Sequence, residues 1–328
     1  MKKKNINLNK LILSKNNNKI LFTPGPASLS NENLIGLEPC FGRGDTSYDN
    51  IENFVLNKIK KIAGHDNIVK FQGSGSLALE IMGMNFLYGK VLIINSGYYS
   101  DRLYNMCLHA KKKYGYIKKI KYIDLNKADK ISEKFDWLYS CYTETSIGLK
   151  MPILKLKKIS KKIKSYLMLD ATASIGLEKD HHLADVIGFS SCKGLFGLTG
   201  GAFITYNKKP QNEINSFYLS LTSHLNKKMT GPYHTICSLY EVLKKHNDFK
   251  YSVKINKIKF VEKFKSYIDY TNDMQPLICT YVNKILKRKN KKTILYKSRG
   301  NISGSVVSHL GEVHLKKDSK AIILKNIL

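Results

Sequence analysis

Arginine is scarce in this chain of 328 residues, although the chain is strongly basic. Lysine and arginine together number 55 against 25 acidic residues, which gives a formal net charge of +30, yet only four of these cations are arginine. Proteins that read bases or grip phosphates rely largely on the planar guanidinium fork. The abundance of Lys, Asn, Ile and Tyr instead indicates an AT-rich coding sequence. We therefore interpret the charge as solvated lysine faces and expect no nucleic-acid partner.

Paired cysteines and long apolar runs are also missing. The six cysteines are scattered with no CxxC pair, which excludes the usual zinc spacings and argues against a disulfide framework. The apolar stretch 11–13 that follows the lysines at 2–4 is too short for a signal peptide, and no segment reaches membrane-spanning length. We expect a cytoplasmic protein with free thiols and no association with membranes.

What is present is the composition of a globular protein: 43% hydrophobic residues, 10% aromatic residues and a mean hydropathy of -0.28. Short apolar runs alternate with amphipathic helical patterns, which favours an α/β domain with a mostly parallel sheet flanked by helices. The candidate strands are 68–71, 91–94, 137–140, 166–169, 186–189 and 202–205, and the candidate helices are 51–62, 77–87 and 156–163. We predict a polar leader over 1–20, a large domain over 21–240 and a smaller α+β domain over 241–328.

Four features at the ends of the predicted strands carry possible chemistry. Gly73–Ser76 is a small-residue turn that leads into a helix, where free N–H groups and the helix dipole favour a phosphate. Asp170 directly follows a strand, and the alternative to a functional role is a helix N-cap. Lys193 stands in a short stretch of small and apolar residues, where a lysine can form an imine. Tyr99 follows another strand end, and its alternative is an ordinary core tyrosine.

Together these four features match what pyridoxal phosphate (PLP) requires. A turn can anchor the phosphate, an aromatic residue can stack on the ring, a carboxylate can partner the pyridine nitrogen, and a lysine can form the imine. The histidines at 181, 182 and 309 have no neighbouring carboxylate at metal-site spacing, so we expect capping or surface roles for them and no metal.

In several ordered segments the chain resembles the class V aminotransferases of PLP fold type I, and most closely the 2-aminoethylphosphonate–pyruvate transaminases. The resemblance extends from residue 21 to about 240. The segments that carry it are Thr23-Pro24-Gly25-Pro26, Gln72-Gly73-Ser74-Gly75-Ser76, Lys90–Asn95 with Gly97, Tyr99 and Arg102, Glu144-Thr145-Ser146-Ile147-Gly148, Asp170–Ser174, and Ser190-Ser191-Cys192-Lys193. The implied fold is a PLP-dependent transferase fold type I.

The resemblance also implies a role for each matching residue. Lys193 would be the catalytic lysine that holds the cofactor, Asp170 would partner the pyridine nitrogen, and Tyr99 would stack on the ring. The other implied cofactor-binding residues are Thr145 at the phenolic oxygen, Ser74, Gly75, Ser76 and Ser191 at the phosphate, and Thr235, which would reach the partner's phosphate across the interface of a homodimer. Pro24 and Gly25 would line the substrate site.

The match fails where the family carries an arginine that grips the substrate carboxylate. That position corresponds to Val306 here. Arg43 or Arg299 could supply the charge instead, and the alternative is a loop salt bridge for Arg43 and a surface position for Arg299. We expect an aminotransferase of small amines, with 2-aminoethylphosphonate and pyruvate or the reverse reaction. The alternatives are an alanine–glyoxylate or serine–pyruvate type of aminotransferase, a PLP lyase, or a basic scaffold with a vestigial site.

Overall fold

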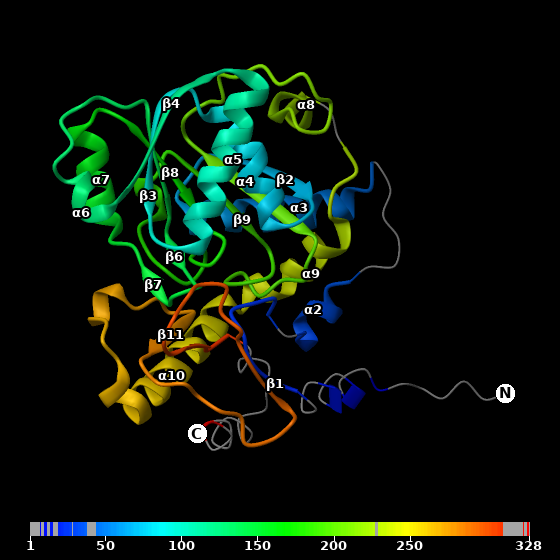
Figure 1. Cartoon of the computed structure of the whole chain (residues 1–328). Helices are drawn as coiled ribbons and strands as arrows, with labels where there is room; N and C mark the ends of the chain where they lie inside the picture. The colour runs from blue at the N-terminus through cyan, green and yellow to red at the C-terminus, as the bar shows by residue number, and fades with distance from the viewer. Residues whose placement is uncertain are drawn as a thin grey trace.

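The computed structural model describes residues 7, 10–11, 14–15, 19–27, 29–37, 44–226, 229–310, 324 and 327. Its centre is a seven-stranded sheet in the order β2-β10-β9-β8-β5-β3-β4 (Figure 1). All neighbouring strands are parallel except β10, which runs antiparallel to both β2 and β9. The strands are β2 (Asn67–Gln72), β3 (Gly89–Asn95), β4 (Ile117–Asp124), β5 (Trp137–Cys141), β8 (Tyr166–Asp170), β9 (Val186–Ser190) and β10 (Gly201–Tyr206). The predicted mostly parallel sheet is confirmed.

Helices cover both faces of this sheet. On one face α3 (Thr46–Ala63), α7 (Ile153–Lys162) and α9 (Tyr233–Lys244) share a core with the sheet, and on the other face α4 (Gly75–Phe86) and α5 (Tyr98–Tyr114) do so. Successive side chains of β3 point to opposite faces of the sheet and so join different cores: Leu92 and Ile94 belong to the first core, whereas Val91 and Ile93 belong to the second. Strands that are buried on both faces have continuous apolar sequences, and the candidate strands were predicted from such apolar runs.

Shorter elements connect these layers. They are α2 (Asn31–Ile35), α6 (Leu125–Ala128), β6 (Thr143–Glu144), β7 (Leu149–Lys150), the 3-10 turn η1 (His181–Leu183) and α8 (Leu221–Asn226). The candidate helix 51–62 lies within α3, which ends before Gly64, whose φ of 71° is left-handed and suits glycine.

A smaller unit lies below the sheet in Figure 1. It contains α10 (His246–Phe264), η2 (Lys265–Tyr267), η3 (Asn272–Met274), β11 (Cys279–Val282), β12 (Thr293–Leu295) and β13 (Ser305–Ser308), with β11 and β13 forming an antiparallel pair.

The predicted domain boundaries need two corrections. β1 (Ile20–Phe22) pairs in parallel with β12, and Phe22 packs with Phe260 in the small unit, so residues 20–22 belong there and not to a leader or to the large domain. The boundary after residue 240 falls inside α9, because the apolar face of this helix continues to Leu243 and packs on the large domain. Most of the predicted leader, residues 1–20, lies outside the described residues.

Two of the histidines differ from the capping or surface roles that we expected for them. His181 and His309 are buried and each bonds a hydroxyl, with 2.9 Å from His181 Nε2 to Ser174 Oγ and 2.9 Å from His309 Nε2 to Thr280 Oγ1. They are therefore core residues and not surface residues. Among the described residues no group of His, Cys, Asp or Glu is arranged to hold a metal, and none of the helices described is long and apolar enough to cross a membrane.

Candidate active site

A cavity of about 320 Å³ opens where three parallel strands end. β5, β8 and β9 finish at Cys141, Asp170 and Ser190, and all three residues line it. Open α/β sheets bind ligands at this edge, outside the carboxyl ends of the strands. Most of the predicted site residues meet here: Pro24, Gly25, Ser74, Gly75, Ser76, Tyr99, Thr145, Asp170, Lys193 and Arg299.

Lys193 follows the end of β9 and is held by the early segment of the chain. The backbone N–H of Ala27 donates to the Cys192 carbonyl at 2.7 Å, which fixes residues 24–27 against the lysine segment. The Lys193 Nζ lies 5.8 Å from the centroid of the Tyr99 ring. The two residues expected to contact the same cofactor from different elements are thus brought together.

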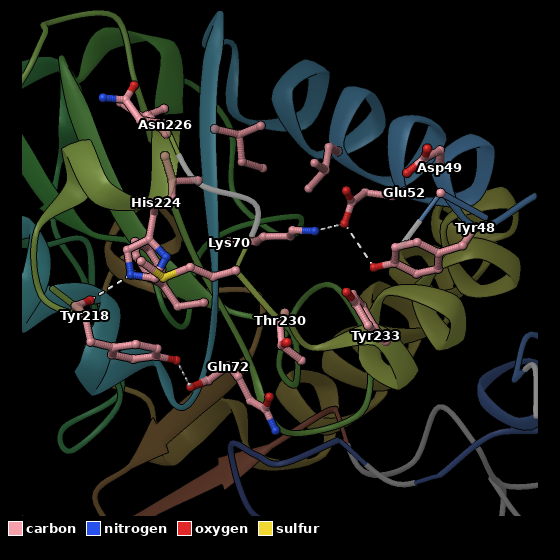
Figure 2. A pocket seen from close by; sticks show the side chains of 18 residues that line it. Tyr48, Asp49, Glu52, Lys70, Gln72, Tyr218, His224, Asn226, Thr230 and Tyr233 are labelled. Carbon is pink, nitrogen blue, oxygen red and sulfur yellow. Dashed lines mark hydrogen bonds and ion pairs between the residues drawn. The ribbon is translucent and has the colours of Figure 1, made fainter. Parts of the chain in front are cut away.

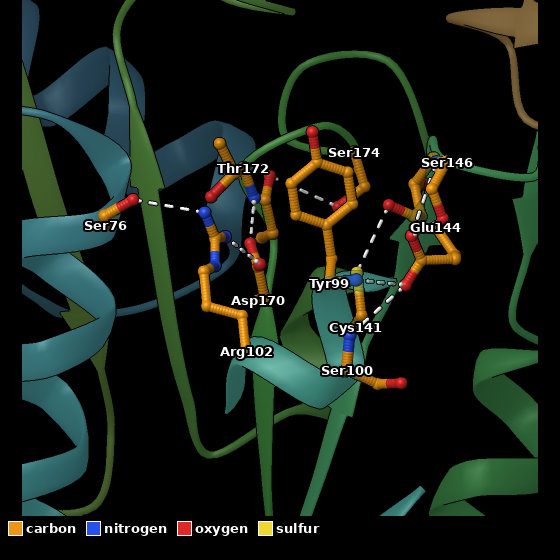
Figure 3. A network of polar contacts seen from close by, with 12 residues as sticks. Ser76, Tyr99, Ser100, Arg102, Cys141, Glu144, Ser146, Asp170, Thr172 and Ser174 are labelled. Carbon is orange, nitrogen blue, oxygen red and sulfur yellow. Dashed lines mark hydrogen bonds and ion pairs between the residues drawn. The ribbon is translucent and has the colours of Figure 1, made fainter. Parts of the chain in front are cut away.

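Asp170 is buried at the tip of β8, with 3% of its surface exposed. Its Oδ1 accepts a hydrogen bond from the Thr172 N–H at 2.9 Å, and its Oδ2 lies 3.3 Å from a terminal nitrogen of Arg102 (Figure 3). The helix N-cap that we considered as the alternative is not formed, because residues 172–177 make turns and not a helix. Asp170 instead lines the cavity and is paired with a cation.

Tyr99 stands at the start of α5, where a buried carboxylate fixes the backbone. Glu144 Oε2 accepts hydrogen bonds from the N–H of Tyr99 at 3.0 Å and of Ser100 at 3.2 Å (Figure 3). A carboxylate at a helix N-terminus satisfies free N–H groups and complements the helix dipole. Burial raises the pKa of Glu144 above its usual value, while its hydrogen bonds with Ser146, Ser100 and Tyr99 oppose that shift.

The predicted phosphate turn runs from the end of β2 into the first turn of α4. Ser74 is the N-cap of α4, but its side chain makes no capping hydrogen bond, so the first N–H groups of the helix have no side-chain cap. A Cβ at Gly75 would lie 3.0 Å from Thr172 Cγ2 and 3.1 Å from its Oγ1, so the absence of a side chain permits this close packing. Such a turn at a helix N-terminus is suited to an anion.

Several buried polar atoms along the cavity have no hydrogen-bond partner in the described part of the chain. They are Thr143 Oγ1, Thr145 Oγ1, Thr172 Oγ1 and Arg102 Nε. Buried polar groups are usually satisfied, so a cluster of orphaned atoms around one cavity indicates a bound polar ligand. With a lysine, a buried aspartate, a tyrosine and an anion-binding turn around the same space, the residues present fit PLP.

The remaining predicted residues are placed differently. Ser191 does not line the cavity, because its buried hydroxyl donates to the carbonyls of Leu198 and Gly201. Thr235 is buried in α9, and its hydroxyl donates to the Thr199 carbonyl at 3.0 Å. Their assignments to the cofactor phosphate remain predictions. Arg43 lies outside the described residues.

Arg299 and Val306 differ in position as well as in chemistry. Arg299 lines the cavity, and its guanidinium carbon lies 5.6 Å from the ring centroid of Tyr98. The Ser298 hydroxyl donates to the Ser146 carbonyl, which fixes the loop of Arg299 next to the Glu144 turn. Val306 is buried in an apolar cluster of the small unit and is not among the cavity residues.

Sequence reasoning missed some residues of the cavity. Arg102, Thr172, Ser190 and Tyr296 line it without having been assigned a role. A signal existed for Arg102, since it lies three positions after Tyr99 and therefore on the same face of a helix. Tyr296 carried no such signal. Burial raises its pKa, and the neighbouring Tyr99 adds to this shift.

Comparisons with known proteins agree with this geometry. The chain is 25% identical over 253 residues to a bifunctional phosphonoacetaldehyde hydrolase/aminoethylphosphonate transaminase of Clostridioides difficile, covering 69% of this chain and 40% of that protein. It is 24% identical over 253 residues to a 2-aminoethylphosphonate–pyruvate transaminase of Pseudomonas aeruginosa, covering 70% and 68%. The chain thus spans less than half of the first of these relatives and about two thirds of the second. No family model matches the chain.

Solved structures show the same fold. An alanine–glyoxylate aminotransferase of Nostoc sp. superposes with a TM-score of 0.77 at 16% identity, and the match covers 92% of both chains. The predicted resemblance and the predicted fold are therefore confirmed: the chain is similar in sequence to 2-aminoethylphosphonate–pyruvate transaminases and has the fold type I architecture of the PLP-dependent aminotransferases.

Proposed function

We propose that this chain is a PLP-dependent aminotransferase of small amines, and that it transfers the amino group between 2-aminoethylphosphonate and pyruvate, or in the reverse direction. The observation that carries the proposal is the single cavity that gathers Lys193, Asp170, Tyr99 and the turn Ser74–Ser76. The sequence relatives support the choice of substrates, because their names include this reaction.

The residues present give each part of the cofactor a partner. Asp170 would hold the pyridine nitrogen, Tyr99 would contact the ring, and the N–H groups of the Ser74–Ser76 turn would hold the phosphate. The Thr145 hydroxyl, which is buried and has no partner among the described residues, would meet the phenolic oxygen. When bound, the cofactor supplies an electron sink that stabilises negative charge at the substrate carbon.

Lys193 does the acid–base work in this proposal. Its amine lines the cavity from the segment after β9, where it can take the proton from the carbon that bears the amino group of the donor. The contacts with residues 24–27 hold the lysine segment in place while that proton moves. Pro24 and Gly25 also line the cavity and would limit the space for the donor.

Arg299 is our candidate for the anionic end of the substrate. Three cations line the cavity: Lys193 serves as the base, Arg102 pairs with Asp170, and Arg299 makes no ion pair with any described carboxylate. A guanidinium is suited to both phosphonate and carboxylate oxygens. Arg43 remains a second candidate from the sequence.

We also propose a homodimer with shared sites. Strand β2 is at one edge of the sheet and borders a second cavity, where the Glu52 carboxylate pairs with Lys70 and accepts from the Tyr48 hydroxyl at 2.9 Å (Figure 2). Tyr218 and Leu225 line this cavity and expose 41% and 51% of their surface, and Phe217, the chain neighbour of Tyr218, exposes 60%. An exposed apolar group at a sheet edge favours association, and the second copy would bring the segment of Thr235 to its partner's phosphate.

A cytoplasmic location is part of the same proposal. The five described cysteines are free thiols, which suits a reducing compartment.

Light scattering of the purified protein tests the dimer. Replacing Phe217 with aspartate should shift the mass to that of a monomer, whereas Tyr251→Asp, at another exposed aromatic residue, should leave it unchanged.

The enzyme assignment is tested in two steps. The purified protein is first incubated with PLP, reduced with borohydride and digested, and mass spectrometry should find the adduct on Lys193. A donor screen then follows with 2-aminoethylphosphonate, L-alanine and L-serine, each with pyruvate or glyoxylate as acceptor. We expect 2-aminoethylphosphonate with pyruvate to give the highest kcat/KM.

Each other outcome has a defined meaning. Activity with L-alanine and glyoxylate alone would replace the phosphonate assignment with the alanine–glyoxylate alternative. Release of ammonia or a cleaved carbon chain without amination of the acceptor would indicate a lyase. An adduct at another lysine, or no adduct, would overturn the proposal.

A further inference from the structure

The guanidinium of Arg102 contacts three residues of the cavity that come from three different elements. One terminal nitrogen lies 3.3 Å from Asp170 Oδ2 at the end of β8, and the other donates to Ser76 Oγ at 3.1 Å in the first turn of α4 (Figure 3). Its central carbon lies 4.9 Å from the ring centroid of Tyr99 in its own helix, α5. In the proposed function these three neighbours serve the pyridine nitrogen, the phosphate and the ring.

A guanidinium is suited to this task in a way that an ammonium is not. Its planar fork can direct two N–H groups at two separate acceptors, while its face lies on an aromatic ring. Hydrogen bonds to an ionised partner are stronger than neutral ones, and burial at the cavity strengthens them further. Asp170 is almost completely buried, whereas the Arg102 side chain is about one quarter exposed. The arginine therefore closes one side of the aspartate.

We infer that Arg102 is a positioning residue that sets Asp170 and the phosphate turn in fixed relation to each other, so that both ends of PLP are recognised together. The inference rests on the proposed function. Arg102 acts through Asp170 and Ser76 and takes no part in proton transfer. Without it, the aspartate loses a partner on its buried oxygen, and the turn loses its link to the end of β8.

The test measures the affinity of the cofactor-depleted protein for PLP by fluorescence titration, independently of turnover. We expect Arg102→Gln to weaken PLP binding about 20-fold and Arg102→Lys about fivefold, because lysine keeps the charge but cannot reach both acceptors. The matched control is Arg288→Gln, which lies in the small unit away from the cavity and should stay within about twofold of the unchanged protein.

Double-mutant cycles separate positioning from a general loss of structure. If Arg102 acts through Asp170, the change Arg102→Gln should cost less than about threefold in PLP affinity when Asp170 is already asparagine. The same reduction is expected when Ser76 is already alanine. A purely structural role would instead lower the melting temperature of the cofactor-free protein and weaken binding by the same factor in every background.

The outcomes of this test and of the proposed function are distinguishable. If the unchanged protein binds no PLP, the proposed function fails and the cycles are not needed. If it binds PLP but Arg102→Gln binds equally well, or if its effect is fully additive with both Asp170→Asn and Ser76→Ala, the inference is overturned and the proposed function stands. Induced circular dichroism of the bound cofactor provides a second signal, which should weaken in Arg102→Gln.

Discussion

Gly25 lies directly against the side chain of Lys193. A methyl group on the Gly25 Cα would come within 2.9 Å of Lys193 Cγ and 3.2 Å of Cε. The backbone of Gly25 also has a φ of 133°, which residues with a side chain rarely adopt. The early loop and the lysine segment, 168 positions apart in the chain, therefore approach each other closely only because this position has no side chain.

Replacing Gly25 with alanine should disturb Lys193 without unfolding the protein. The new methyl group must push the lysine aside or shift the loop, so we expect the rate of PLP capture by borohydride at Lys193 to fall at least about tenfold. The matched control is Gly115→Ala, which has a φ of 70° but no atom within 4 Å of its new methyl group. It carries backbone strain alone and should leave the capture rate unchanged. Equal capture rates in both variants would contradict the contact.

Much of this site could be predicted from the sequence because its residues stand beside strands with strong local signals. Asp170 directly follows a continuous apolar run, and Lys193 follows another, so the ends of parallel strands bring them to one edge of the sheet. The glycine turn at 73–76 can be predicted for the same reason: small residues between a strand and a helix mark a turn, because glycine tolerates backbone conformations that other residues avoid.

The rest depends on contacts between distant segments, which leave no local pattern. Tyr296 reaches the cavity from a loop in the small unit. Residues 20–22 span the predicted junction of the leader and the large domain, yet they pair with β12 more than 270 positions later. His309 was expected in a capping or surface role, but the sheet β11–β13 and α10 enclose it. Such outcomes follow from tertiary packing and not from propensity.

The substrate role of Arg299 predicts a change in KM and not in kcat. We expect Arg299→Ala to raise KM for an anionic donor about 50-fold, because the anion loses a charge-assisted hydrogen bond, while an amine without an anionic group, such as propylamine, keeps its KM. The KM of Arg299→Lys for the anionic donor should fall between that of the unchanged protein and that of Arg299→Ala. Steady-state kinetics with both donors measures the effect, and Arg288→Ala serves as the control. A similar rise in KM for propylamine would mean that Arg299 shapes the cavity and does not bind the anion.

Two buried histidines predict an acid-sensitive fold. Burial lowers the pKa of His181 and of His309 to about 3, well below the value near 6.5 of an unfolded chain. Between these values the unfolded chain binds a proton that the folded chain does not, so stability falls as the pH falls from 6.5 toward 3. Each histidine contributes up to about 1.4 kcal/mol per pH unit.

Urea unfolding between pH 7.5 and 5 measures this dependence. We expect His309→Gln to reduce the slope of the free energy of unfolding against pH by the equivalent of about one proton. Its stability at pH 7.5 is nevertheless lower, because the hydrogen bond to Thr280 is lost. Thr280→Val is the control: it removes the same hydrogen bond but keeps the titrating ring, so its slope should match that of the unchanged protein. An unaltered slope in His309→Gln would show that other groups cause the acid sensitivity.

An arginine at position 306, where the resemblance in sequence leads us to expect one, should destabilise the protein and not improve the site. Val306 is 2% exposed on β13, paired with Tyr281 on β11 and packed in an apolar cluster of the small unit. A charged group placed there has no described carboxylate partner, and burying an unpaired charge is costly. We expect Val306→Arg to lower the free energy of unfolding by at least about 3 kcal/mol, and Val306→Ile by about 1 kcal/mol or less. Thermal and urea unfolding measure both. If the arginine variant is instead stable and lowers KM for anionic donors, its side chain must reach the cavity, and Arg299 is not the required cation.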